Sequence, residues 1–487
     1  MKRKLIILST ACLSLISFIS CESLVDVDNM QTVSKDENYQ TSNDVNASIL
    51  GVYTQLQSVA EQCVILGELR SGYLELTAAG IANSDLADIV NNSVSIDNTY
   101  ADAAPFYSVI RSCNDILANI DEVSTLDPSF TDSIKEHYRA EIIGVRNYVY
   151  FCLGKIFGEA YYYEDAVSEA GELPDYTVMD ISTLVSTLIT SQSAIMSSYD
   201  TSIEDDMSTD WQRSRFGLYA AHTLLADLSL FRASMTGSTA DYQAVLDNLY
   251  VVMNINSETT STQTFKVGSD FSGSNWVNIF SSMISSTSEV IWGIDFSKTY
   301  SQTHSLQDIF NTNAAVTVSE SMLDKWESSD PRSSITVKDD YTVGKYCVDK
   351  DDLDDDAPVI IYRAAEVHLM YAEALCYLGY MDEALTIVNE GNSSVEYTTT
   401  GAKTYNAASL GVRGRMGLSS SVLVVTEPDV VKGITVDIIR NERLCELAFE
   451  GKTWGDMLRY AILDGSTQIE AGSNSIPQAQ WYLTHGE

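Results

Sequence analysis

Apolar residues recur every three or four positions along much of the chain, which is the spacing of one face of an α-helix. Over residues 132–157 the apolar positions advance in such steps from Ile134 to Ile156. This pattern predicts one continuous amphipathic helix, with Asp132 as its N-cap. Residues 214–233 carry a second apolar face of the same kind.

The predicted helices come in pairs that are joined by short turns. After 214–233, Gly237 and Ser238 interrupt the pattern, and a partner helix is expected over 242–253. A long helix, a short glycine turn and a shorter helix form the hairpin of tetratricopeptide-like proteins. The sequence therefore predicts helical hairpins as the main building unit.

A further pair is predicted over residues 364–391. Its first helix should end at Gly379, and its second should begin at Asp382 as N-cap and stop at Gly391. Long Ser/Thr/Asn-rich stretches separate the pairs, so the repeat is irregular, and we expect the helices to be a scaffold whose loops carry the function. These stretches cover 81–100, 255–285 and 392–430.

The N-terminal segment has the pattern of a secretory leader. Three basic residues, 2–4, precede an apolar run over 5–19, which is shorter than the roughly 20 residues of a membrane-spanning helix. Residues 18–21, Phe-Ile-Ser-Cys, resemble a bacterial lipobox, in which the cysteine is acylated. We therefore expect residues 1–20 to be a signal peptide, Cys21 to be the lipid attachment site and 21–45 to be a spacer; an ordinary cleavage site beside a stray cysteine is the alternative.

The formal net charge of −39 limits the partners that the protein can bind. A chain this acidic is repelled by nucleic acid and by anionic membrane surfaces, so nucleic-acid binding is excluded. A flexible spacer would hold the acidic body clear of the lipid, because repulsion is screened beyond ~8 Å at physiological salt.

The eight cysteines form no CxxC or metal-binding spacing. Three of them lie among apolar residues of helical period, where a thiol behaves as a small hydrophobe; these are Cys152, Cys376 and Cys445. Three others could form a disulfide in an oxidising compartment, although the sequence does not say which pair; these are Cys63, Cys113 and Cys347.

Three glutamates, Glu442, Glu446 and Glu450, recur every four residues and would share one face of an unbroken helix. A glycoside hydrolase also needs two carboxylates, but residues one turn apart on a single helix do not flank a scissile bond. Basic residues lie beside them, so we interpret them as ion-paired structural carboxylates. The acidic run 349–356 is interpreted as solvated rather than as a calcium site, and His368 as a buried core residue.

Two sequence blocks resemble conserved blocks of the RagB/SusD family. The first runs from Tyr362 to Leu375 (YRAAEVHLMYAEAL), and the second from Arg440 to Arg459 (RNERLCELAFEGKTWGDMLR). They occur in the family's order, and weaker similarity extends from Ala47 through Arg332. The resemblance is interrupted over 392–411, which looks like an insertion.

The resemblance implies an all-α body of four tetratricopeptide-like helix pairs with long irregular loop insertions. It also implies a surface-exposed outer-membrane lipoprotein that binds an oligosaccharide or another small nutrient and delivers it to a SusC-like TonB-dependent transporter. It implies no catalysis, cofactor or metal. We expect a SusD-like N-terminal region over 46–260 and a RagB/SusD C-terminal region over 261–487, which share one compact body.

A sugar-binding platform needs exposed flat rings with polar neighbours, and Tyr and Trp meet this need at low entropy cost. Candidates outside the helical stripes are Tyr73, Arg70, Trp276, Asn275 and Tyr300. The segment 289–296, which contains Trp292, is instead predicted to be a buried strand. A tetratricopeptide-type scaffold that binds a peptide or protein, and a glycoside hydrolase that uses the 442–450 carboxylates, are the alternatives.

Overall fold

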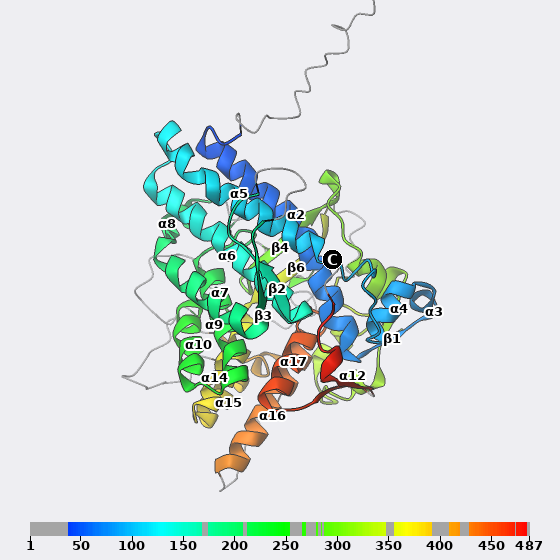
Figure 1. Ribbon diagram of the computed structural model, residues 1–487. Coiled ribbons are helices and arrows are strands. Elements are labelled where there is room, and N and C mark those ends of the chain that lie inside the picture. Colours follow the sequence, from blue (N-terminus) through cyan, green and yellow to red (C-terminus); the bar gives the residue numbers. More distant parts are fainter. Residues whose placement is uncertain are drawn as a thin grey trace, which may run out of the picture.

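The computed structural model is built mainly of α-helices, with a few short strands, and the all-α fold prediction is confirmed (Figure 1). The long helices lie beside one another, and smaller elements cover one side of them. The structure describes residues 38–167, 174–207, 212–253, 265–268, 279–280, 284, 287–346, 355–391, 409–418, 428–472 and 474–484.

Ten helices of nine or more residues, among those described, form the body. Consecutive members pack on each other, from α2 on α5, α5 on α6, α6 on α7, α7 on α9 and α9 on α10, so they form a continuous stack. The helices are α2 (Ser42–Glu68), α5 (Ala104–Leu126), α6 (Asp132–Phe157), α7 (Ile181–Ile195), α9 (Leu218–Thr236), α10 (Thr239–Val252), α14 (Ala364–Tyr377), α15 (Met381–Asn389), α16 (Pro428–Leu447) and α17 (Thr453–Leu463).

The stack continues across a long stretch of sequence. Helix α14 packs directly on α10 although more than a hundred residues separate them, and α15 and α16 then pack on α14. Among the intervening residues that the structure describes are the short helices α12 (Glu320–Leu323) and α13 (Pro331–Thr336). The other short helices precede α10; they are α3 (Ala78–Ala82), α4 (Ser84–Val90) and α8 (Thr201–Asp206).

The described strands form four antiparallel pairs, β1 with β5, β2 with β3, β4 with β6 and β7 with β8. The longest pair, β4–β6, lies between the helical stack and the smaller elements (Figure 1). The strands are β1 (Leu74–Leu76), β2 (Glu159–Tyr162), β3 (Thr177–Asp180), β4 (Val290–Ser297), β5 (Val316–Val318), β6 (Asp355–Arg363), β7 (Gln468–Ala471) and β8 (Asn474–Pro477).

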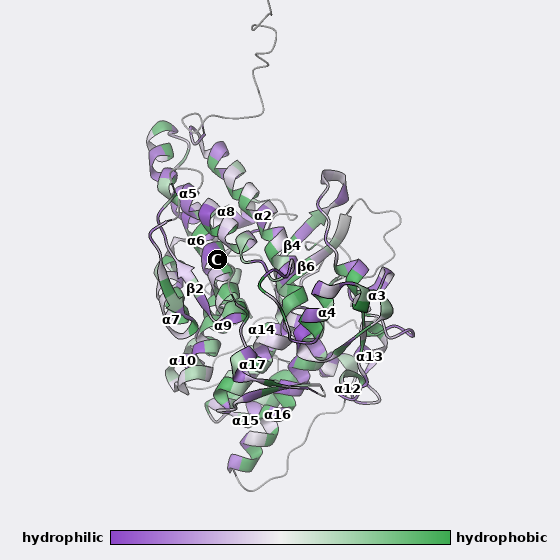
Figure 2. Ribbon diagram, turned by 45° about the vertical axis from the view of Figure 1, so that its right-hand side comes forward, coloured by the Kyte–Doolittle hydropathy of each residue, from purple (hydrophilic) through white to green (hydrophobic). Residues whose placement is uncertain are grey.

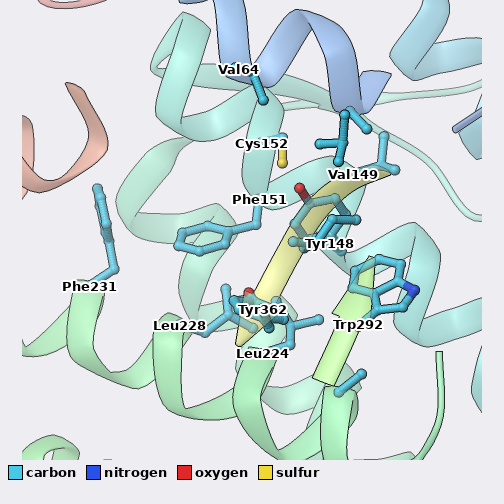
Figure 3. Close-up of a cluster of buried hydrophobic side chains, with 14 of the residues drawn as sticks. Val64, Tyr148, Val149, Phe151, Cys152, Leu224, Leu228, Phe231, Trp292 and Tyr362 are labelled. Atoms are coloured by element: carbon cyan, nitrogen blue, oxygen red, sulfur yellow. The ribbon is translucent and has the colours of Figure 1, made fainter. Parts of the chain in front are cut away.

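One large core joins the stack to the β4–β6 pair. Trp292 on β4 is fully buried, as predicted, and its ring packs edge-on against Tyr148 of α6 at a centroid distance of 4.9 Å (Figure 3). The same core holds Tyr362 of β6 and extends along the chain from Tyr39 to Trp481. Hydrophobic and hydrophilic residues alternate around the outer helices (Figure 2), as expected for helices with one buried face.

No helix in the described part of the chain is both long and apolar enough to cross a membrane.

Two of the predicted N-caps are wrong by one or two residues. Helix α6 begins at Asp132, but its N-cap is Thr131, whose hydroxyl accepts a hydrogen bond from the Ile134 amide. Helix α15 begins at Met381, so Asp382 lies in its first turn rather than at its cap. In both places the acidic residue is inside the helix, where it still interacts favourably with the helix dipole.

His368 is buried in α14, as predicted, with 1% of its surface exposed. Its Nδ1 lies 2.7 Å from the Ala364 carbonyl oxygen. Burial and, to a smaller extent, the charge of Arg415 lower the pKa of His368, whereas the hydrogen bond to Ala364 raises it. The resulting pKa is about 4. The folded protein therefore holds a neutral imidazole at a pH where the unfolded chain binds a proton.

The free energy of unfolding should fall as the pH drops from about 6.5 towards 4, because only the unfolded state takes up this proton. At about pH 4, His368 should account for a loss of about 3 kcal/mol. Urea unfolding of the wild type and of His368→Gln at pH 7, 5.5 and 4.5 measures this contribution as a difference between the two proteins. Parallel pH profiles would contradict the prediction.

Candidate functional site

A surface cleft of about 410 Å³ lies where the Tyr73 loop meets α16 and α17. A second hollow of about 310 Å³ lies along α16, and Asp437 and Asn441 line both spaces. The two hollows are therefore neighbours on the surface of this helix.

Tyr73 forms one wall of the cleft and is half-buried. It follows Gly72, which has a φ of +75°, a conformation that a residue with a side chain rarely adopts. A Cβ atom at Gly72 would lie 2.1 Å from the Ala471 carbonyl oxygen, so the loop is held directly against the β7–β8 hairpin. The Ser319 amide also donates to the Tyr73 carbonyl at 3.0 Å. The backbone that carries this ring is therefore held by contacts with two distant segments.

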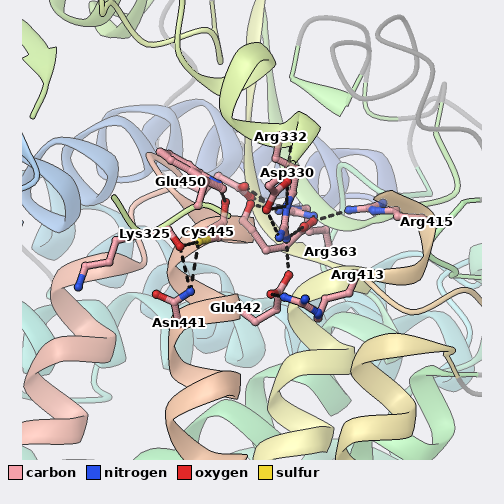
Figure 4. A network of polar contacts seen from close by, with 12 residues as sticks. Lys325, Asp330, Arg332, Arg363, Arg413, Arg415, Asn441, Glu442, Cys445 and Glu450 are labelled. Atoms are coloured by element: carbon pink, nitrogen blue, oxygen red, sulfur yellow. Dashed lines mark hydrogen bonds and ion pairs between the residues drawn. The ribbon is translucent and has the colours of Figure 1, made fainter. Parts of the chain in front are cut away.

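Polar groups border the Tyr73 ring. The ammonium of Lys325 lies 5.9 Å from the ring centroid, and Asn441 of α16 donates a hydrogen bond of 3.1 Å to the Lys325 carbonyl (Figure 4). Asp437 lies one helical turn before Asn441, and both side chains are exposed. Among the described residues, no ion pair occupies the Lys325 ammonium or the Asp437 carboxylate. These groups can exchange hydrogen bonds with hydroxyls.

The opposite wall is made by α17 and is held rigidly. Tyr460 donates to Glu373 at 3.3 Å, and the Arg440 guanidinium stacks on its ring at 4.3 Å from the centroid. Arg443 binds Asp456 through two hydrogen bonds of 3.0 Å. Burial would raise the pKa of Asp456, but the charges of Arg443 and Arg459 lower it, so its carboxylate is ionised at neutral pH.

Behind the cleft lies a buried network of arginines and carboxylates (Figure 4). Glu442, Glu446 and Glu450 are each no more than 3% exposed. Glu446 pairs with Arg332 at 2.9 Å and with Arg363 at 2.8 Å. The prediction that these carboxylates are ion-paired is confirmed.

The helical geometry assumed for the three carboxylates is wrong. Helix α16 ends at Leu447, and Phe449 has a φ of +67°, so Glu450 lies in the turn that follows the helix. This turn lets Glu450 face Lys345 and Arg363. Burial would raise the pKa of Glu446 and of Glu450, but the neighbouring cations lower both. Glu446 and Glu450 are thus ionised and paired with cations inside the protein.

The structure does not bring all of the predicted binding residues together. Tyr73 lines the cleft, whereas Tyr300 is 78% exposed in a short turn after β4 and is not part of the cleft lining. Arg70 is only 1% exposed; it stacks on Trp454 at 3.9 Å and donates to the Gln480 carbonyl at 2.8 Å. Trp276, Asn275 and Cys21 lie outside the described residues. Ligand binding by Trp276 and Asn275 and lipid attachment at Cys21 therefore stay predictions.

Several cleft residues were missed from the sequence, namely Lys325, Asp437, Asn441 and Tyr460. Asp437 and Asn441 are polar residues spaced by four, on a helix whose other face is apolar. That spacing could have indicated an exposed helical face next to the second family block. Lys325 gave no such signal, because only the tertiary fold brings it to α16.

Comparison with known proteins gives a consistent result. Residues 341–482 match the model of the SusD family. The chain is 22% identical to the SusD-like protein P38 of Formosa agariphila, over 90% of this chain and 88% of that protein. It is 24% identical to the SusD-like protein P25 of the same organism, over 58% of this chain and 50% of that protein.

Solved structures share the fold. A SusD superfamily protein from Bacteroides fragilis superposes with a TM-score of 0.69 at 15% identity, covering 92% of this chain and 96% of that one. The surface glycan-binding protein A of Bacteroides uniformis superposes with a TM-score of 0.67 at 18% identity, covering 91% and 96%. The helical stack, the two sequence blocks and these matches show that the chain is similar to proteins of the SusD family in its C-terminal sequence, over residues 341–482, and in its fold.

Proposed function

We propose that this protein captures an oligosaccharide in the cleft beside Tyr73 and delivers it to a SusC-like TonB-dependent transporter. The observation that carries the proposal is the half-exposed Tyr73 ring, which is held in place by its backbone contacts and bordered by Lys325 and Asn441. A sugar ring presents an apolar C–H face edged by hydroxyls, and a flat aromatic ring next to hydrogen-bonding groups complements it.

The proposed role is binding without catalysis. The three recurring glutamates, which were the candidates for a hydrolase, are buried and paired with arginine or lysine. An acid catalyst must reach the glycosidic oxygen, and Glu446 and Glu450 line neither the cleft nor the second hollow. Glu442 lines the second hollow, but it is 2% exposed and paired with Arg332 and Arg413. The similarity to a named glycan-binding protein of Bacteroides uniformis also supports capture.

The location that goes with this function is the cell surface. We propose that residues 1–20 are removed, that Cys21 is acylated, and that the residues between Cys21 and the folded body tether it to the outer membrane. The body begins before the predicted spacer end at residue 45, because Tyr39 is buried in the core and α2 begins at Ser42. Isolating the complex from detergent-solubilised membranes tests the partner and the anchor together. A co-purifying transporter and an acylated N-terminal peptide support the proposal, whereas an unmodified protein in the aqueous extract contradicts it.

Replacement of Tyr73 by Ala should weaken oligosaccharide binding about tenfold, because one stacked ring contributes roughly 1.4 kcal/mol. An array of neutral and acidic oligosaccharides identifies the ligand, and calorimetry on the best binder gives the Kd. The Tm should change little, since the ring is half-exposed.

Tyr176→Ala is the matched control, because this tyrosine is 48% exposed and does not line the cleft. Tyr300→Ala tests the other predicted aromatic separately. Equal oligosaccharide affinity of Tyr73→Ala and the wild type would show that the cleft beside Tyr73 is not the binding site. A reducing-sugar assay on the same ligand would reveal a hydrolase, and peptide binding without glycan binding would favour the scaffold alternative.

A further inference from the structure

A small inner cavity of about 80 Å³ adjoins the cleft. Arg443, Lys452 and Asp456 line both spaces, so the cavity lies directly behind the cleft wall. It has room for a few molecules the size of water but not for a sugar ring. The cavity is therefore too small to hold the captured ligand.

Two thiols meet in this cavity. Cys63 on α2 and Cys152 on α6 both line it, and neither forms a disulfide in this structure. Cys63, Cys152 and Tyr148 line the cavity together, and the two thiols lie close enough for each to shift the pKa of the other. The sequence gave no hint of this contact, because the two cysteines lie on different helices and Cys152 has the pattern of a core residue. Figure 3 shows Cys152 at the edge of the core, next to Val64 of α2.

The surroundings favour a thiolate at Cys152. Burial alone would raise its pKa, but the neighbouring Cys63 thiol and the charge of Lys155 lower it to about 7. Burial instead raises the pKa of Cys113 and of Cys376 to about 12. The charged and titratable groups that act on the two thiols, and on Lys155 beside them, are Tyr148, Lys155, Asp227, Tyr362, Glu366 and Lys452.

We propose that Cys63 and Cys152 form a peroxide-reactive dithiol, a modification site that is separate from the ligand cleft. Hydrogen peroxide is small enough for the cavity. The Cys152 thiolate attacks one peroxide oxygen, breaks the O–O bond and becomes a sulfenic acid, while the leaving hydroxide takes up a proton to become water. The Cys63 thiol then attacks the Cys152 sulfur, an S–S bond replaces the S–O bond, and the Cys63 proton leaves with the hydroxyl as a second water. Two thiols are oxidised and one peroxide is reduced.

This proposal does not depend on the identity of the captured ligand. A low-pKa thiolate with a resolving thiol in contact is the arrangement found in redox-sensing cysteines. The product would be a covalent link between α2 and α6, which pack against each other. A bridge that closes a long loop should raise the Tm by roughly 5 °C, and a reductant should reverse the change.

The test treats the full-length reduced protein with hydrogen peroxide, quenches it, and maps the cysteines by mass spectrometry after alkylation. In the wild type we expect a peptide that links Cys63 to Cys152, reversible by dithiothreitol. The link should form at least roughly 100-fold faster than oxidation of Cys113. Its rate should rise with pH through a midpoint near 7, as the pKa of Cys152 requires.

Variants separate the two thiols. Cys63→Ser should accumulate a sulfenic acid at Cys152 that dimedone traps, and Cys152→Ser should leave Cys63 reduced. Cys113→Ser is the matched control, because its thiol is buried in the same fold but is remote from this cavity, and it should behave as the wild type. If a variant fails to fold, the pH dependence of the rate of Cys63–Cys152 linkage in the wild type still tests the proposal. Alkylated Cys63 and Cys152 after peroxide treatment, a linked peptide that joins other cysteines, or a midpoint above pH 8.5 would each overturn the proposal.

Discussion

Replacement of Arg363 by Met should destabilise the protein by about 4 kcal/mol, because it leaves buried carboxylates without their cation. The Arg363 guanidinium donates to Glu289 and Glu446 at 2.8 Å each and to both oxygens of Glu450 at 2.7 and 2.8 Å. It also donates to the Glu446 carbonyl at 2.8 Å. Arg363 ends β6, whereas Glu446 is near the end of α16, so the substitution would separate two parts of the core. Urea unfolding followed by circular dichroism measures the loss.

Two control variants make this result specific. Arg363→Lys keeps the charge but not the planar fork of donors, and we expect a loss of about 2 kcal/mol. Arg139→Met removes an arginine whose partner Asp121 is 69% exposed, and such a surface pair contributes less than about 1 kcal/mol. Similar losses in Arg363→Met and Arg139→Met would mean that the network does not hold the core together.

Local pattern predicted the helices well, since each of them depends mainly on residues close in sequence. The predicted range of α6 matches its observed bounds, and the glycines at 379 and 391 both adopt positive φ at the predicted helix ends. The pattern did not predict that α14 packs on α10, because that contact joins helices more than a hundred residues apart in the chain. Packing partners depend on surface shape, which the spacing of apolar residues does not encode.

The site was less predictable for the same reason. Tyr73 could be named because a tyrosine outside the helical stripes stands out, but its neighbour Lys325 comes from a segment about 250 residues later in the chain. Arg70 was chosen for its charge, yet the fold places it under Trp454, where it stacks instead of facing solvent. Charge alone does not distinguish an exposed arginine from one that is buried and contacts other buried groups.

Removal of the Glu68 side chain should have the second-largest effect. Helix α17 begins without a side-chain cap of its own, since Lys452 occupies the N-cap position. Glu68, at the end of α2, takes this role and accepts hydrogen bonds from the amides of Gly451 at 2.7 Å and Lys452 at 2.9 Å, and from the Thr453 hydroxyl at 2.8 Å. Glu68→Ala would leave these buried donors without a partner, and we expect a loss of about 3 kcal/mol in urea unfolding.

Glu68→Gln is the matched variant, because its amide oxygen can still accept from the backbone and its amino group can donate to Thr453. It should lose less than about 1 kcal/mol. Asp180→Ala removes an ordinary exposed cap of α7, whose carboxylate accepts from Thr183 at 2.8 Å, and should cost about 1 kcal/mol. If Glu68→Ala loses no more than Asp180→Ala, the contact between α2 and α17 is local capping only. A larger loss, accompanied by weaker oligosaccharide binding, would indicate that Glu68 also holds the α17 wall of the cleft in place.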